Sequence, residues 1–146
     1  MKMRVKLYRF RNEWKERGAG WCRLLRDNDK KSISLLMRQD QTKKIVANFI
    51  ISDQIDLKPM AGNAKAWTWY CMDYSEDESG SKELLACRFK ELDHKQEFKD
   101  KIEAALLFNR DAKAGNDLVW ADEVEDVVDE GEGFTENNEM APGADD

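Results

Sequence analysis

Short apolar runs alternate with polar turns over residues 4–90, a pattern typical of successive antiparallel strands. In one run, Ile33, Leu35 and Met37 occupy every second position and predict one buried face. Gly18 and Gly20 interrupt another run, where a bulge or bend is expected. The predicted strands are 4–10, 14–25, 32–37, 45–51, 67–74 and 84–89, and residues 53–63 are predicted to be a loop.

After residue 90 the apolar period changes from 2 to 3.6 and predicts one amphipathic helix over about 93–108. Asp93 is the predicted N-cap, with Gln96 three residues later as in a capping box. The predicted buried positions of this helix are Phe98, Ile102, Ala105 and Leu106. Six or seven antiparallel strands followed by one helix indicate a mainly β fold, a small sandwich or partly open barrel whose open end the helix covers.

Charge divides the chain of 146 residues into two parts. The formal net charge is −6, but residues 1–110 carry 23 of the 24 Lys and Arg and only 17 of the 30 Asp and Glu, a balance of +6. Residues 111–146 have a balance of −12. We therefore predict a folded domain over 1–110 and an acidic, largely disordered tail over 111–146. The first 44 residues alone carry +9, which suits docking of an acidic partner.

The tail contains apolar residues that allow two further interpretations. Residues 118–128 include Leu118 and Trp120 and could form a short helix that docks on a partner or an export receptor, or else part of an unstructured linker. The acidic segment 122–130 could fold back on the basic surface as a tethered competitor. The alternative is that the tail only provides solubility.

Residues typical of catalysis or metal binding are scarce. Cys22, Cys71 and Cys87 form no C-x-x-C pair, so we expect reduced, mostly buried thiols rather than a disulfide framework or a zinc site. The single histidine, His94, falls in the predicted first helical turn and is expected to be exposed. Phosphate-binding glycine motifs are absent. We therefore predict a non-enzyme without catalytic residues, metal or cofactor, and a soluble, intracellular protein because neither a membrane span nor a signal peptide is evident.

The most informative motif is Glu13-Trp14-Lys15-Glu16-Arg17-Gly18. Together with five other blocks in the same order and spacing, over about residues 4–106, it resembles the Ran-binding domain family. The other blocks are Arg4 to Phe10, Leu35 to Arg38, Lys44 to Asn48, Trp69 with Asp73-Tyr74, and Leu85 to Lys90.

The resemblance implies a pleckstrin-homology-like fold, a seven-stranded antiparallel sandwich with a C-terminal capping helix. It also implies binding of the GTP form of the small GTPase Ran, whose acidic C-terminal extension lies on a basic patch while another face meets the switch region. Family members promote hydrolysis stimulated by the GTPase-activating protein and release of transport receptors. On this basis we expect a monomer when free, cytoplasmic or shuttling through the nucleus, that binds neither nucleic acid nor membrane.

Two kinds of residue are predicted to contact Ran: an apolar anchor, Trp14, and charged or polar residues around it. The alternatives are a solvated strand-face charge for each cation, a ring covering the barrel end for Trp14, and an amide bracing its own turn for Asn48. Trp69 is expected in the core. The predicted contact residues are Trp14, Lys15, Glu16, Arg17, Arg38, Lys43, Lys44 and Asn48, with Arg23 and Arg26 as further candidates.

The sequence departs from the family pattern at two places. Only Met1, Lys2 and Met3 precede the match, where family members usually carry an acidic arm that embraces Ran. Phe49 replaces a common histidine, and we expect this change to affect packing more than recognition.

Three other functions are alternatives to Ran binding. A phosphoinositide-binding pleckstrin-homology module would use the basic N-terminal third on a membrane, although the acidic tail would oppose anionic lipid. A scaffold for proline-rich peptides would need an exposed aromatic groove and would show weak salt dependence. An enzyme would show turnover without a partner.

Overall fold

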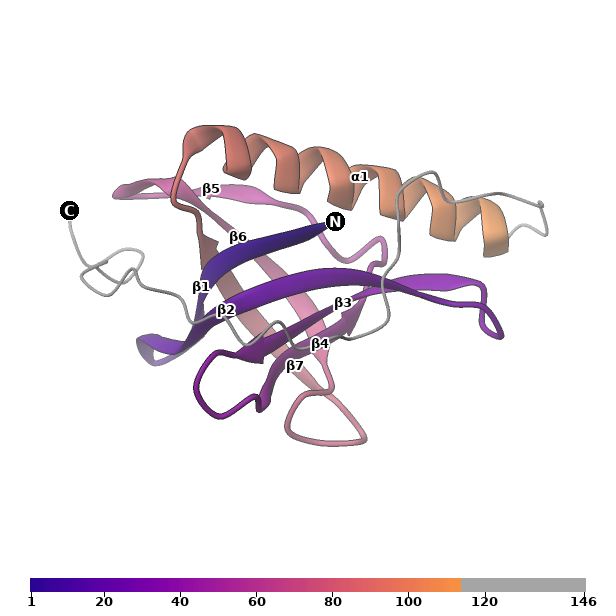
Figure 1. Cartoon of the computed structure of the whole chain (residues 1–146), viewed down its shortest axis with the longest axis horizontal. Helices are drawn as coiled ribbons and strands as arrows, with labels where there is room; N and C mark the ends of the chain where they lie inside the picture. The colour runs from indigo at the N-terminus through magenta and orange to yellow at the C-terminus, as the bar shows by residue number, and fades with distance from the viewer. Residues whose placement is uncertain (114–146) are drawn as a thin grey trace.

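The computed structural model describes residues 1–113, which form seven strands and one helix (Figure 1). All pairs of neighbouring strands are antiparallel and belong to one sheet. In chain order the elements are β1 (Lys2–Arg11), β2 (Glu13–Asp27), β3 (Ser32–Gln39), β4 (Ile45–Ile50), β5 (Lys58–Met60), β6 (Asn63–Asp73), β7 (Ser81–Arg88) and α1 (Leu92–Lys113).

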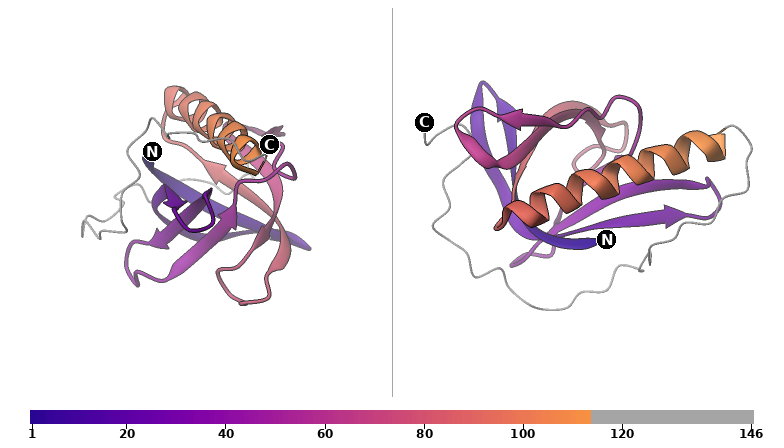
Figure 2. Two further views of the ribbon diagram at one scale, coloured as in Figure 1. Left: turned by 90° about the vertical axis from the view of Figure 1, so that its right-hand side faces the viewer. Right: turned by 90° about the horizontal axis from the view of Figure 1, so that it is seen from above.

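The sheet consists of two meanders joined through β1. Its strand order is β4-β3-β2-β1-β7-β6-β5, so β1 pairs with both β2 and β7. The two arms bend toward each other (Figure 2). At the point where they meet, the Asn48 N–H donates to Asp73 Oδ1 at 2.8 Å, and the Tyr74 N–H donates to the Asn48 carbonyl at 2.8 Å. The result is the strongly curved, mainly β architecture that the sequence predicts.

The core lies between the curved sheet and α1. Val5 and Leu7 of β1 point into it, and α1 buries Phe98 and Ile102 against it. We call this side of the sheet the inner face and the opposite side the outer face. A chain of aromatic contacts joins the layers: Phe49 to Trp69 at 5.9 Å, Trp69 to Phe98 at 5.8 Å, and Phe89 to Phe98 at 4.9 Å between ring centroids.

Each aromatic pair of this kind contributes about 0.5–1.5 kcal/mol beyond the area that it buries. Trp69, only 2% exposed, is thus a core residue as predicted. Phe49 is equally buried against it, which makes position 49 a packing position.

The prediction of an unbroken loop over 53–63 is wrong. This segment contains β5, and β6 begins earlier than predicted, at Asn63. β5 is an edge strand with one neighbour, and Pro59 is tolerated there because an edge position does not need a second N–H partner. Three residues are also too few to show an alternating pattern.

The helix α1 is longer at both ends than predicted. It begins at Leu92, so Asp93 lies in its first turn rather than at the N-cap. Near its C-terminal end, the side chain of Asn109 accepts from the Ile33 N–H at 2.7 Å and donates to the carbonyls of Ile33 and Ile51 at 2.9 and 2.7 Å. Because polar contacts hold this end of the helix, the sequence there has no apolar periodicity from which the end of the helix could be predicted. The candidate docking helix of residues 118–128 lies outside the described residues.

A bulge in β2 confirms the irregularity predicted at the glycines. Tyr8 pairs with Glu16 and Leu7 with Gly18, so Arg17 has no opposite residue on β1. The extra residue reverses the alternation of side chains along β2. Trp14, before the bulge, points outward, whereas Gly18, Gly20 and Cys22, after it, lie on the inner side. At Gly20 the chain also passes very close to β3, because a Cβ there would lie 2.0 Å from the Arg38 carbonyl oxygen.

Candidate functional site

An exposed aromatic row crosses the outer face at the end of the β1–β2 hairpin. Trp14, Phe10, Leu84 and Tyr70 lie opposite one another on β2, β1, β7 and β6, so their side chains share this face. The rings of Trp14 and Phe10 pack edge to face, with centroids 5.3 Å apart. Phe10 is 40% exposed and Tyr70 is 55% exposed. Such a stripe of exposed aromatics is suited to anchoring a partner.

Further along the same strands the outer face becomes basic. Lys2 and Arg4 lie over the ring of Trp21, with the Lys2 Nζ at 4.7 Å and the Arg4 Cζ at 5.0 Å from its centroid. We call the three ladder rows here the basic rows. They are Arg88–Lys6–Ala19, Arg4–Trp21–Arg38, and Lys2–Arg23–Leu36–Asn48.

The turn between β3 and β4 borders the basic rows and is fixed by one of their arginines. Arg38 Nη1 donates to the Lys43 carbonyl at 2.9 Å, and Lys43 has a positive φ of 62°. Arg4 Nη2 contacts Asp40 Oδ2 at 2.6 Å, which holds the turn against β1. Lys44 is exposed at the end of the turn. Arg38 therefore positions this turn besides adding charge to the face.

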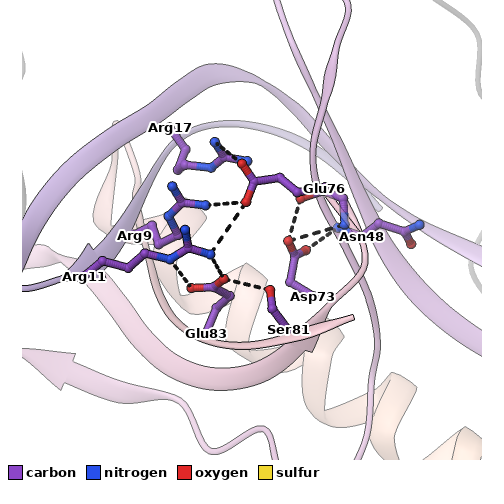
Figure 3. A network of polar contacts seen from close by, with 9 residues as sticks. Arg9, Arg11, Arg17, Asn48, Asp73, Glu76, Ser81 and Glu83 are labelled. Carbon is purple, nitrogen blue, oxygen red and sulfur yellow. Dashed lines mark hydrogen bonds and ion pairs between the residues drawn. The ribbon is translucent and has the colours of Figure 1, made fainter. Parts of the chain in front are cut away.

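A second charged group, the arginine cluster of Arg9, Arg11 and Arg17, lies on the opposite side of the hairpin (Figure 3). Glu76 in the β6–β7 loop receives all three: its carboxylate lies 2.7 Å from Arg9 Nη1, 3.5 Å from Arg17 Nη1 and 3.6 Å from Arg11 Nη2. Arg11 also pairs with the buried Glu83 of β7 through two of its nitrogens.

The arginine cluster keeps both carboxylates ionised. Desolvation by burial opposes ionisation of Glu76, but the charge of Arg17 and the hydrogen bond from Arg9 outweigh it and lower the pKa of Glu76. Burial likewise opposes ionisation of Glu83, and the hydrogen bonds from Arg11 and Ser81 outweigh it and lower the pKa of Glu83. The loop is therefore clamped to the hairpin at neutral pH.

The residues predicted from the sequence to contact a partner lie on the outer face, on the inner side of the hairpin and in the β3–β4 turn. The outer face carries Trp14, Glu16, Arg38 and Asn48, together with Arg23. Lys15 and Arg17 lie on the inner side of the hairpin, where Lys15 is opposite Arg9 and Arg17 contacts Glu76. Lys43 and Lys44 lie in the β3–β4 turn, and Arg26 is exposed near the end of β2, away from the motif.

The outer face also holds residues beyond those predicted from the sequence. Strict alternation along β1 was the available signal, because Lys2, Arg4, Lys6 and Phe10 occupy even positions whereas the core residues Val5 and Leu7 occupy odd ones. Arg9 and Arg11 continue the inward series past the core and could have been found in the same way. Tyr70, Leu84 and Arg88 could not, because their register with β1 is not visible in the sequence.

Other chemistry is limited in the described part of the chain. Cys22, Cys71 and Cys87 are free and buried, as expected, and desolvation raises the pKa of Cys22 and of Cys71 to about 12. His94 is exposed in the first turn of α1. Within residues 1–113 no cluster of three or more His, Cys, Asp or Glu side chains is arranged to hold a metal, and no helix is long and apolar enough to cross a membrane.

A family model described as RanBP1 domain matches residues 1–107, which include both faces of the hairpin and most of α1. The chain belongs to the RanBP1 domain family. Its aromatic row and basic rows all lie inside the matched segment.

Proteins with curated descriptions are similar to part of this chain. The chain is 40% identical over 103 residues to the human E3 SUMO-protein ligase RanBP2. The aligned region covers 68% of this chain but 3% of that protein. It is 45% identical over 94 residues to the Ran-specific GTPase-activating protein homolog of Dictyostelium discoideum, covering 60% of this chain and 48% of that protein. The chain thus spans less than half the length of either relative.

Solved structures show the same fold for the RanBP1 domain. The Ran binding domain of the nuclear complex component Nup2 from Ashbya gossypii superposes with a TM-score of 0.60 at 19% identity, over 74% of this chain and 93% of that one. The fold is therefore the pleckstrin-homology-like fold expected from the sequence.

Proposed function

We propose that this protein binds the GTP form of Ran and holds Ran's acidic C-terminal extension on the outer face of the sheet. The observation that carries the proposal is the aromatic row beside the basic rows on one continuous face. The names of the relatives, Ran-specific GTPase-activating protein homolog and RanBP2, support the choice of partner.

The two parts of the face have different roles in this proposal. Clustered cations steer an acidic peptide toward the basic rows, and arginines such as Arg38 and Arg23 can bind its carboxylates bidentately. The half-buried ring of Trp14, supported by Phe10, anchors an apolar part of the partner. Asn48, in the row of Arg23, supplies a side-chain amide on the same face.

Preference for the GTP form requires contact with a part of Ran that changes with the nucleotide. We assign this contact to the β1–β2 hairpin near its tip, where Arg17 contacts the clamped β6–β7 loop and Lys15 and Glu16 are exposed. Lys43 and Lys44 extend the contact from the β3–β4 turn. An ordered loop loses less entropy on binding than a free one, so the clamp favours affinity.

The protein acts in this proposal as a binding module and contributes no catalytic group. It makes Ran a better substrate for its GTPase-activating protein and promotes release of transport receptors. It is a monomer when free, is cytoplasmic or shuttles through the nucleus, and consists of a domain over 1–110 with an acidic tail over 111–146.

Calorimetry with Ran loaded with GTP analogue or with GDP tests the proposal. We expect tight binding of the GTP form only, weakened steeply by salt because charges dominate the encounter. Arg38→Glu should weaken binding, whereas Lys30→Glu, the same charge change on the exposed β2–β3 turn, should not. Equal binding of both nucleotide forms, or of neither, contradicts the proposal.

The basic rows also suit a second candidate, an anionic phosphoinositide surface. Sedimentation with vesicles that contain phosphatidylinositol bisphosphate distinguishes the two. Binding to vesicles without binding to Ran would favour the membrane function.

A further inference from the structure

The outer face collects positive charge on three adjacent rows and has one unusual cation at its centre. Lys6 lies between Arg88 and Ala19, is only 4% exposed and forms no ion pair within residues 1–113. Cations held on adjacent rows of one face repel one another, and an anion bound among them reduces that repulsion. The basic rows therefore favour an anionic occupant. Their cations are Lys2, Arg4, Lys6, Arg23, Arg38 and Arg88.

This face is available to a segment beyond the described fold. The helix α1 covers the inner side (Figure 2). Its residues Phe98, Ile102, Ala105 and Phe108 are buried there. The helix ends at Lys113, and 33 further residues follow it in the chain.

Residues 122–130 of the same chain have the matching composition. The sequence Asp-Glu-Val-Glu-Asp-Val-Val-Asp-Glu holds six carboxylates in nine residues, and the basic rows hold six cations, of which Arg4 also pairs with Asp40. Its valines can pack on the apolar stems of lysine and arginine and on the half-buried side chain of Trp21.

The end of α1 lies near the basic rows, because Asn109 is hydrogen-bonded to Ile33 and Ile33 pairs with Arg26, three residues along β2 from Arg23. Eight residues, 114–121, separate the end of α1 from the acidic segment and span up to roughly 26 Å when extended. A tether of this length gives the segment an effective concentration on the order of millimolar at its own domain.

We propose that residues 122–130 dock on the basic rows of their own chain and that an acidic partner peptide must displace them. The intramolecular contact stands independently of the proposed function, and only the competition with the Ran extension rests on it. Since both ligands need the same cations, the tail lowers the apparent affinity for the partner and makes binding selective for more acidic or more multivalent peptides.

The docking is tested first on the free, full-length protein. In the variant Val124→Cys, a spin label reacts only with the new cysteine, because the three native thiols are buried. We expect broadening of the amide signals of Arg4, Trp21 and Arg23 that disappears in about 0.5 M salt, where charges are strongly screened. Broadening centred instead on the cleft of about 250 Å³ beside Lys31, Ile50 and Asn109, or no localised broadening, overturns the proposal.

A charge-neutral variant tests whether the acidic character drives the docking. Replacing the six carboxylates of residues 122–130 by amides should abolish the broadening, and replacing Glu136 and Glu139 alone should not. The amide variant should also bind an acidic peptide corresponding to the Ran extension about tenfold more tightly, within the range usual for coupled sites. Unchanged broadening in the amide variant refutes docking, whereas loss of broadening with unchanged peptide affinity refutes only the competition.

Discussion

Glu76 and Arg17, 59 residues apart in the sequence, clamp the β6–β7 loop onto the bulge of β2, with Oε2 of Glu76 3.5 Å from Nη1 of Arg17. The bulge is what turns Arg17 toward the loop, and Arg9 and Arg11 complete the clamp from β1. The conformation of the hairpin tip and that of the loop are thereby coupled.

Glu76→Gln should loosen the loop with little effect on global stability. Glu76 is 38% exposed at its side chain, and ion pairs with this much exposure contribute about 1 kcal/mol or less. Hydrogen exchange at amides 75–80 should accelerate, while the midpoint of urea unfolding should shift only slightly. Glu78→Gln, an exposed carboxylate in the same loop, is the control and should leave exchange unchanged. Equal exchange in the two variants would contradict the clamp.

Stability should fall in acid because of the same carboxylates. The pKa values of Glu76 and Glu83 are lower in the folded protein than in the unfolded chain. The stability that these carboxylates contribute to the fold is therefore complete above the pKa of the unfolded chain, about 4.3, and is lost as the pH falls through their lower pKa values in the folded protein. Urea unfolding between pH 5 and 3 measures this slope. The double variant Glu76→Gln, Glu83→Gln should show a shallower slope, and an identical slope would exclude these groups as its source.

Trp14→Ala should weaken Ran binding about 30-fold or more while the protein stays folded, because half-buried tryptophans are frequent interface anchors. Loss of the contact with Phe10 should cost about 0.5–1.5 kcal/mol of stability. Calorimetry with the GTP form of Ran and thermal unfolding measure the two effects. Trp14→Phe keeps a ring against Phe10 and should retain part of the affinity. Full binding by Trp14→Ala would remove Trp14 from the interface.

Gly20→Ala should destabilise the fold and disturb the basic rows together. The added Cβ would lie 2.0 Å from the Arg38 carbonyl, so β2 and β3 must separate, at a cost of about 1–3 kcal/mol. Urea unfolding measures the loss, and the backbone signals of Arg38 and Lys43 should shift. Ala61→Gly, in an exposed turn, is the control for a small backbone change.

The native thiols should resist modification. Burial raises the pKa of Cys22 and Cys71 to about 12 and that of Cys87 well above its usual range. A chromogenic disulfide reagent at pH 8 should react slowly with the folded protein and with three thiols after unfolding in urea. Rapid reaction of the folded protein would show that the strands open locally.

The sequence predicts where most strands lie along the chain, because β1, β3 and β6 have clear alternation and clear turn residues. It fails at β5, a three-residue edge strand, and at the end of α1, where Asn109 uses hydrogen bonds instead of apolar contacts. The first failure follows from the shortness of β5, which pairs with the next strand in the chain, and the second from contacts of Asn109 with Ile33 and Ile51, which are distant in the chain.

The candidate site was only partly predictable for a related reason. The motif around Trp14 is recognisable, but simple alternation would place Trp14 on the same side as Gly18 and Cys22. The bulge at Arg17 moves Trp14 to the outer face, beside Phe10 and in line with Tyr70. One extra residue in β2 therefore decides which side chains share a surface.

The pairing of Lys6 with Arg88 has a consequence for folding. Because β1 lies in the centre of the sheet, its second edge stays unpaired until β7 arrives from the far end of the domain. Such distant pairing slows folding and exposes a strand edge in partly folded chains. Lys6, Arg9 and Arg11 on that strand add like charges to any two chains that meet through it, which disfavours aggregation during this interval.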